Sequence, residues 1–151
     1  MTAGTSQPCI CTSLRKASRA VTRHYDAALA PWGMTAVQFA LLRNIARREE
    51  TGGVPLARLA DAMVMDRSSL YRTLTPLERR GWVELSSGTG RNRVAQISAQ
   101  GLAAMRAAED EWRKVQAQVA DLFGTGRVDA LNALLADMTR EAQGLLDGDV
   151  A

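Results

Sequence analysis

Histidine and cysteine are scarce in this chain of 151 residues, which has one histidine and two cysteines. No Ser-His-Asp set can be assembled around His24, and no pair of carboxylates lies on a catalytic motif. A tetrahedral zinc site built from Cys9, Cys11 and His24 would have to be shared across a dimer. The composition therefore argues against an enzyme, and we expect no catalytic residue, no metal and no cofactor.

Long apolar runs are also missing. No window approaches the roughly 20 apolar residues that a membrane span needs, and the first residues contain no basic leader followed by an apolar segment. Cys9 and Cys11 are too few and too close together for a disulfide framework. We therefore expect a soluble, cytoplasmic protein that makes no contact with membranes.

Negative charge is sparse in the first part of the chain. Residues 1–93 carry 14 of the 19 basic residues but only seven of the 16 acidic ones, and the remainder is net acidic. A polyanion would therefore meet the first two-thirds of the chain.

Apolar residues recur at three- and four-residue steps along most of the sequence, which predicts a mainly helical protein. Thr35 and Gln38 form a plausible capping box, and Asp66 is a plausible N-cap. After Gly81 the apolar period shortens towards two, which predicts a small β-hairpin. The expected helices are 9–30, 36–48, a short one starting near Pro55, one capped by Asp66, 99–123 and 127–146, and the expected strands are 82–86 and 93–98.

The segment Met65–Trp82 predicts an amphipathic helix whose core face carries Leu70, Leu74 and Leu77. Its other side has hydroxyl and guanidinium groups but hardly any carboxylate, which suits phosphate oxygens and base edges in a major groove. Pro76 should kink the helix and leave its N-terminal half free to enter the groove. The outward residues are Ser68, Arg72, Thr75 and Arg79, flanked by Ser69 and Tyr71.

The predicted hairpin has a basic turn, "SSGTGRNR", which places Arg91 and Arg93 at the tip of an exposed loop. Minor grooves attract arginine. Gly88 and Gly90 do not make this turn a phosphate loop, since the Gly-Lys-Ser/Thr pattern is missing and a strand follows. The order of helix, tight turn, polar helix and basic hairpin predicts a winged helix-turn-helix that binds DNA.

The segments "LADAM", "MDRSSL", "PLERRGWVE" and "GRNRVAQISAQG" resemble the MarR family of winged helix-turn-helix transcriptional regulators. The resemblance implies a homodimer that represses from a pseudo-palindromic double-stranded DNA operator. It implies a DNA-binding domain over 35–98 and helical dimerisation regions over 1–34 and 99–151. The implied base or phosphate contacts are Arg67, Ser68, Ser69, Tyr71 and Arg72, with Arg91 as the wing arginine.

Two positions depart from the family pattern. Thr89 replaces the aspartate that usually braces the wing arginine, which predicts a looser wing. Val64 occupies a turn position where glycine is common, which predicts a turn that is built differently.

The first helix, "CICTSLRKASRAVTRHYD", is similar to that of organic-hydroperoxide sensors in the same family. The similarity places Cys11 on their reactive cysteine and Tyr25 on a tyrosine that hydrogen-bonds it, and it implies oxidation to a sulfenic acid followed by release of DNA. The other two tyrosines of that site are Arg15 and Ala36 here, although Arg15 could still lower the thiol pKa. The alternative is that Cys9 and Cys11 only pack at a dimer seam.

Other signals and another function stay open. MarR-like proteins bind small aromatic anions, and Trp32 and Trp112 could line such an effector site, although aromatic residues at helical spacing are usually core. The rival from another class is a winged-helix module that binds a protein partner and no DNA.

Overall fold

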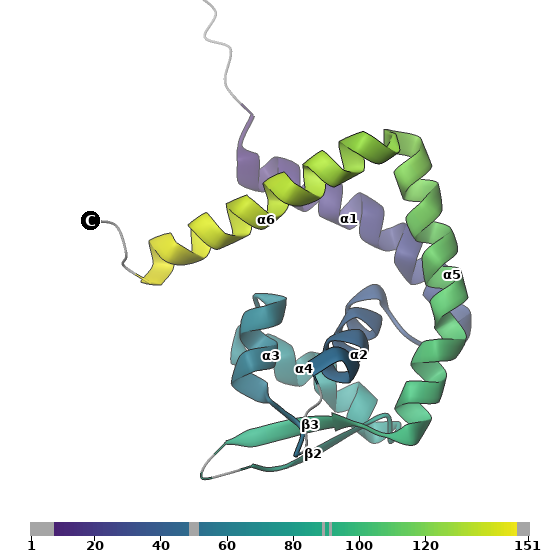
Figure 1. Cartoon of the computed structure of the whole chain (residues 1–151), viewed down its shortest axis with the longest axis vertical. Coiled ribbons are helices and arrows are strands. Elements are labelled where there is room, and N and C mark those ends of the chain that lie inside the picture. Colours follow the sequence, from purple (N-terminus) through teal and green to yellow (C-terminus); the bar gives the residue numbers. More distant parts are fainter. Residues whose placement is uncertain (1–7, 49–51, 89, 91, 148–151) are drawn as a thin grey trace, which may run out of the picture. The chain divides into compact units, whose positions relative to one another are not determined.

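The structure is a computed structural model that describes residues 8–48, 52–88, 90 and 92–147. It is mainly helical and contains one small antiparallel sheet, as the sequence predicts (Figure 1). Two compact units divide the chain between Arg113 and Lys114. The first contains every element up to the sheet and the start of the long helix α5, and the second contains the rest of α5 and α6.

The first helix, α1, spans Ile10–Leu29 and is followed by a short 3-10 helix, η1, over Ala30–Trp32. Gly33 then adopts a left-handed conformation with φ 70°, which turns the chain towards the next helix. Asp26 reaches across this turn, and its Oδ1 accepts a hydrogen bond of 2.7 Å from the backbone N–H of Ala36. The end of α1 is thus tied to the beginning of α2.

Helix α2 spans Ala36–Arg48, the range that the sequence predicts. The predicted capping box is confirmed: the Thr35 N–H donates to Gln38 Oε1 at 3.0 Å, and the Gln38 N–H donates to Thr35 Oγ1 at 3.3 Å. These two bonds satisfy N–H groups that have no partner inside the helix. They explain why the start of α2 could be read from local sequence.

Two short helices follow, α3 over Leu56–Met63 and α4 over Arg67–Arg79. Between them Val64 adopts the left-handed conformation, with φ 51° and ψ 49°, and its N–H donates to Asp61 O at 3.1 Å. The expectation that a valine here would change the turn is wrong. The turn keeps the left-handed geometry that usually calls for glycine, although a β-branched side chain is disfavoured there.

We expect Val64→Gly to raise the free energy of unfolding by about 0.5–1 kcal/mol, since relief of the left-handed strain exceeds the entropy that glycine adds to the unfolded chain. The valine side chain is 57% exposed, so little buried area is lost. Urea unfolding at one fixed protein concentration measures the change. Val64→Ala keeps a Cβ and should gain less, and a Val64→Gly protein less stable than the wild type would contradict the prediction.

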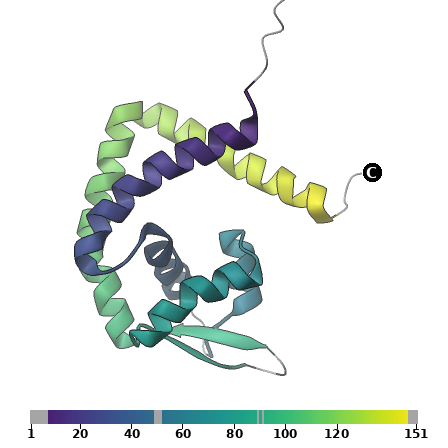
Figure 2. The same ribbon diagram turned by 180° about the vertical axis from the view of Figure 1, so that it is seen from behind.

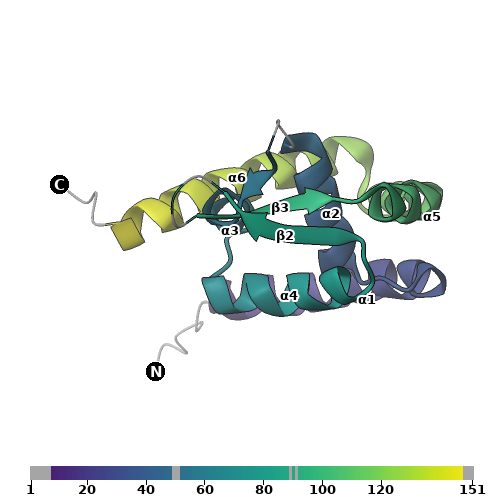
Figure 3. The same ribbon diagram turned by 90° about the horizontal axis from the view of Figure 1, so that it is seen from below.

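The sheet has three strands, one more than the sequence predicts. β1 (Val54–Pro55), β2 (Val83–Ser87) and β3 (Arg93–Ile97) are antiparallel in the order β1-β3-β2. β3 is therefore central, and Val54 pairs with Ala95. Figure 2 shows β2 and β3 extending beyond α3 and α4 as a wing, and Figure 3 shows α4 running beside them.

A single apolar core lies under these elements. Leu70, Leu74 and Leu77 of α4 are all buried, which confirms the predicted core face. Met105 and Ala108 from the first half of α5 join the same core. The remaining buried side chains come mainly from α2, α3 and the sheet: Phe39, Leu41, Leu42, Ile45, Val54, Leu56, Leu59, Ala60, Val83 and Ala95.

Helix α5 spans Ala99–Phe123 and begins in close contact with the end of α4. Ser98 Oγ donates to Gly81 O at 2.6 Å and accepts from the Gly101 N–H at 3.0 Å. Gly101 lies so close to Trp82 that a Cβ on it would sit 2.1 Å from the Trp82 carbonyl oxygen. The backbone of α5 therefore rests directly on Trp82, three residues after the end of α4.

Helix α6 spans Thr125–Asp147 after a left-handed Gly124, in the second unit. Three of its leucines, Leu131, Leu134 and Leu145, are exposed. Within the described residues, no helix is long and apolar enough to cross a membrane.

Candidate nucleic-acid interface

The N-terminus of α4 is held by a cap that the sequence predicts. Asp66 Oδ1 accepts from the Ser69 N–H at 2.8 Å, and Asp66 Oδ2 accepts from Ser69 Oγ at 2.7 Å. The Ser69 hydroxyl, followed by the Ser69 backbone N–H, holds the pKa of the Asp66 carboxyl below its ordinary value of 3.8. Because folding lowers this pKa, the cap stabilises the fold above about pH 4 and is lost as the pH falls through the lowered value.

The same serine positions an arginine. Arg72 Nη2 donates to Ser69 Oγ at 3.0 Å, so a chain of hydrogen bonds runs from Asp66 through Ser69 to Arg72. Arg72 is exposed, whereas Ser69 is half-buried. Ser69 therefore orients the Arg72 guanidinium, which stays exposed at the surface of α4.

The hydroxyl groups on α4 differ in their exposure and in their hydrogen bonds within the helix. Ser68 is exposed at the first turn. Thr75 is half-buried, and its Oγ1 donates to Tyr71 O at 2.8 Å, so that hydroxyl proton is used inside the helix. α4 is a continuous helix through Pro76. Ser68 and Arg72 in the N-terminal half of α4 are exposed, and so is Arg79 in its last turn.

The wing corrects one sequence assignment. Arg93 does not lie at the tip of the hairpin: it is the first residue of β3, paired with Ser87. Its guanidinium carbon lies 6.0 Å from the centroid of the Tyr71 ring on α4. Thr89 and Arg91 lie outside the described residues, so the predicted wing arginine and its missing brace stay predictions.

A small cleft separates the wing from the two short helices. Its volume is about 90 Å³, and its polar lining comes from Arg67, Tyr71, Asn92 and Arg93. Asn92 was not singled out in the sequence, because only the pairing of β2 with β3 brings it beside α4.

Arg80 makes a link that the sequence does not reveal. Its Nη1 donates to Gly33 O, 47 residues earlier in the chain. Its guanidinium carbon also lies 4.9 Å from the centroid of the Trp82 ring. The end of α4 is thus fixed to the turn that follows α1.

The predicted sensor residues lie on α1. Cys9 and Cys11 are both exposed. The Thr12 side chain, with backbone N–H groups at the start of α1, lowers the pKa of the Cys9 thiol below its ordinary value. Partial burial raises the pKa of Tyr25. Arg15 lies one helical turn after Cys11 and is exposed.

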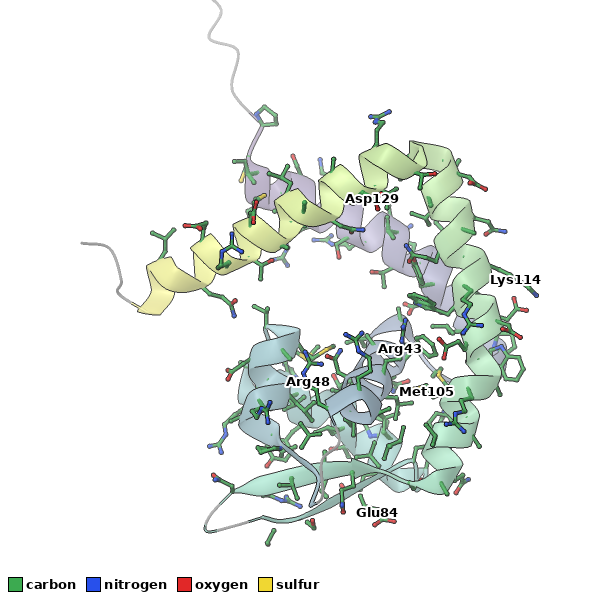
Figure 4. The ribbon with its side chains drawn as sticks, viewed as in Figure 1. Arg43, Arg48, Glu84, Met105, Lys114 and Asp129 are labelled. Atoms are coloured by element: carbon green, nitrogen blue, oxygen red, sulfur yellow. The ribbon has the colours of Figure 1, made fainter. Side chains whose placement is uncertain are left out.

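The two predicted effector tryptophans are in different surroundings. Trp32 lies in η1 and is 40% exposed. Trp112 stacks on Phe39 with ring centroids 5.9 Å apart. Arg43 extends from α2 (Figure 4). Its guanidinium carbon lies 4.2 Å from the Trp112 ring centroid. No ring contact between Trp32 and Trp112 occurs in the described part of the chain.

Over residues 8–48, 52–88, 90 and 92–147, no three His, Cys, Asp or Glu side chains gather as a metal site would require.

Comparisons with known proteins agree on one family. The family model described as MarR family matches residues 32–92. The transcriptional regulator MosR of M. tuberculosis, crystallised in complex with DNA, is 30% identical, with a TM-score of 0.81 over 91% of this chain and 98% of that one. None of the curated proteins compared with the chain matches it.

More distant structures share the fold. CouR of Rhodococcus jostii, bound to p-coumaroyl-CoA, is 20% identical, with a TM-score of 0.75 over 87% of this chain and 92% of that one. MepR of S. aureus, in a DNA complex, is 15% identical, with a TM-score of 0.75 over 88% of this chain and 98% of that one.

Proposed function

The chain belongs to the MarR family of transcriptional regulators, and on that premise we propose that it is a sequence-specific DNA-binding repressor that acts as a homodimer in the cytoplasm. The DNA-binding domain is proposed to span 35–98, and the dimerisation regions 1–34 and 99–151. The relative MosR, at 30% identity, was crystallised with DNA. Repression follows the family default.

The observation that carries the proposal is the start of α4. Ser68 and Arg72 are exposed there, no acidic residue occupies the first turn, and Ser69 holds the Arg72 guanidinium in place. A preorganised guanidinium can form two parallel hydrogen bonds to a guanine edge or to a phosphate. A helix that presents such a group beside a basic wing is suited to a major groove.

The dimer is supported by apolar side chains that stay exposed in the single chain. On α1, Ile10 and Leu14 are 66% and 38% exposed and lie one turn apart on the same face. On α6, Leu131, Leu134 and Leu145 are also exposed. Exposed apolar side chains that recur along one face of a helix favour an interface, and a second copy of the same chain is the occupant that the family implies.

Salt dependence of DNA binding tests the proposal against the rival, a winged-helix module that binds only protein. Fluorescence anisotropy with a duplex from the region upstream of the protein's own gene, and with a scrambled duplex, gives both affinities. The regulator should prefer the first duplex, and its affinity should fall roughly a thousandfold between about 50 and 200 mM salt, since arginines displace counterions. No binding to either duplex at about 50 mM salt would support the protein-binding module.

A thiol signal is favoured by the chemistry of Cys9. Both thiols are exposed, and the lowered pKa of Cys9 increases its thiolate fraction, although the family resemblance points to Cys11. A thiolate attacks one peroxide oxygen of an organic hydroperoxide, which breaks the O–O bond, gives a sulfenic acid and releases the alcohol after protonation. Arg15, one turn after Cys11, is proposed as a neighbour of the reacting thiol. Tyr25 is 14 residues after Cys11 on the same helix, roughly 21 Å along its axis, so its proposed hydrogen bond to the thiol requires the Tyr25 of a second copy of the chain.

The same anisotropy assay separates the two thiols and the alternative effector. One equivalent of cumene hydroperoxide should release DNA from the wild type. If Cys9 is the reactive thiol, Cys11→Ser should still release DNA and Cys9→Ser should not. If Cys11 is the reactive thiol, the two results are exchanged. DNA binding that does not change with oxidant would rule out the redox role. A small aromatic anion would then be the remaining candidate effector, and the place to look for its binding is the surface where Arg43 lies over the Trp112 ring.

A further inference from the structure

The cleft between the wing and the two short helices has the size of a site for a small group. Its volume of about 90 Å³ is well below the roughly 300–1,000 Å³ typical of pockets for drug-sized molecules. It lies beside the first turn of α4, where Arg67 and Tyr71 occupy one flank of the helix. A ligand here would be an ion or a single group of a larger molecule.

The charge of the lining selects an anion. Arg67 and Arg93 are both exposed, and no carboxylate in the described residues forms an ion pair with either of them. Asn92 adds an amide, and none of the described residues that line the cleft is acidic. The nearby Asp66 carboxylate accepts two hydrogen bonds from Ser69 and caps α4. Two free guanidinium groups around one small cleft favour an oxyanion with several acceptor oxygens.

Arg93, one of the lining residues, is restrained before any ligand binds. Arg93 is fixed at the backbone by its pairing with Ser87, and its guanidinium lies over the Tyr71 ring at 6.0 Å. An arginine that already rests on an aromatic ring loses less conformational freedom on binding. The contact also joins the wing to α4, so both elements meet the ligand together.

The outward face of α4 is separate from the cleft. At about 100° per residue, Ser68 and Arg72 point away from the core, whereas Arg67 and Tyr71 lie on the flank. The Arg72 side chain is directed instead by Ser69. Base contact and cleft contact are therefore made by different residues of the same helix.

We propose that this cleft binds one phosphate of the DNA backbone, held by Arg67, Tyr71, Asn92 and Arg93, and that it sets the register of α4 while Arg72 and Ser68 read bases. The inference rests on the proposed function, because it needs a DNA duplex as the ligand. It assigns Arg67, Tyr71 and Arg93 to contacts with the DNA backbone, so these residues are no longer proposed to contact bases. Phosphate contacts position a protein on DNA and carry no sequence information directly.

Substitution at Arg93 gives the first test. Arg93→Ala in the full chain should weaken binding to the upstream duplex and to the scrambled duplex by the same factor, roughly tenfold, and lower the salt slope by about 1. Arg58→Ala removes an exposed arginine of α3 that does not line the cleft, and it should change neither affinity by more than about twofold. A change in the ratio of the two affinities for Arg93→Ala would mean that Arg93 reads a base, and it would overturn the proposal.

Neutral methylphosphonates, introduced one at a time into the upstream duplex, give the second test. Wild type and Arg58→Ala should lose affinity at several positions, whereas Arg67→Ala and Arg93→Ala should both become insensitive at the same position in each half-site. Different positions for the two variants, or full sensitivity in both, would overturn the shared phosphate while DNA binding itself stands. If the wild type binds neither unmodified duplex, the proposed function and the cleft assignment fail together.

Discussion

Gly101→Ala is expected to lower the free energy of unfolding by about 3 kcal/mol, the upper end of what overpacking costs. The added Cβ would lie 2.1 Å from the Trp82 carbonyl oxygen, 2.8 Å from its carbonyl carbon and 2.9 Å from its Cα. All three are backbone atoms, so no side chain can rotate away to make room. Thermal unfolding followed by circular dichroism should show a melting temperature lower by roughly 6–12 °C.

Gly126→Ala is the matched control for that prediction. Gly126 also lies in a helix, but a Cβ there has no atom within 4 Å. Since alanine is a better helix former than glycine, this variant should melt at the wild-type temperature or slightly above it. Both variants must be compared at one protein concentration, because the proposed homodimer would be stabilised by mass action. A Gly101→Ala protein that melts within 2 °C of the control would show that α5 can move off Trp82 at little cost.

Arg72→Ala is expected to weaken binding to the upstream duplex by about 1–3 kcal/mol, roughly 5-fold to 150-fold, if the arginine makes a bidentate contact to a base. Binding to the scrambled duplex should fall less, so the preference for the upstream duplex should shrink. Anisotropy titrations at fixed salt measure both affinities. The side chain is exposed and its hydrogen bond is to Ser69, so the fold should be retained.

Two further variants decide how that result is interpreted. Ser69→Ala removes the support of the guanidinium but keeps its charge, and it should weaken specific binding less than Arg72→Ala does. Arg106→Ala removes an exposed arginine on α5 and should leave both affinities unchanged. Wild-type affinity in Arg72→Ala, with the protein folded, would remove this residue from the interface.

Local signals in the sequence were enough to place most helices. The Thr35 and Gln38 capping box and the Asp66 cap act within three residues, so the starts of α2 and α4 were predicted correctly. The leucine spacing of α4 likewise identified its buried face. Each of these features depends on neighbours in the chain, which the sequence displays directly.

Features that depend on distant partners were missed. β1 has only two residues, and it exists because Val54 and Pro55 pair with β3 some 40 positions later. The hydrogen bond from Arg80 to Gly33 joins residues 47 positions apart, and no spacing pattern in the sequence predicts it. Arg93 was counted with the hairpin tip although the predicted strand began there, because the sequence does not show that Ser87 extends β2 and pairs with it. The cleft at the wing could not be predicted either, because strand pairing brings its lining residues together from distant parts of the chain.

The two ties at the end of α1 make that end of the helix a pivot. Asp26 binds the start of α2, and Gly33 accepts from Arg80 at the end of α4. With 20 residues at about 1.5 Å each, α1 is a lever of roughly 30 Å whose far end carries the cysteines. A shift of about 3 Å at that far end turns the helix by only some 6°. In the proposed thiol signal, a rotation of α1 caused by oxidation of Cys9 or Cys11 would be transmitted to the end of α4 through the hydrogen bond from Arg80 to Gly33, and to the start of α2 through the bond from Ala36 to Asp26.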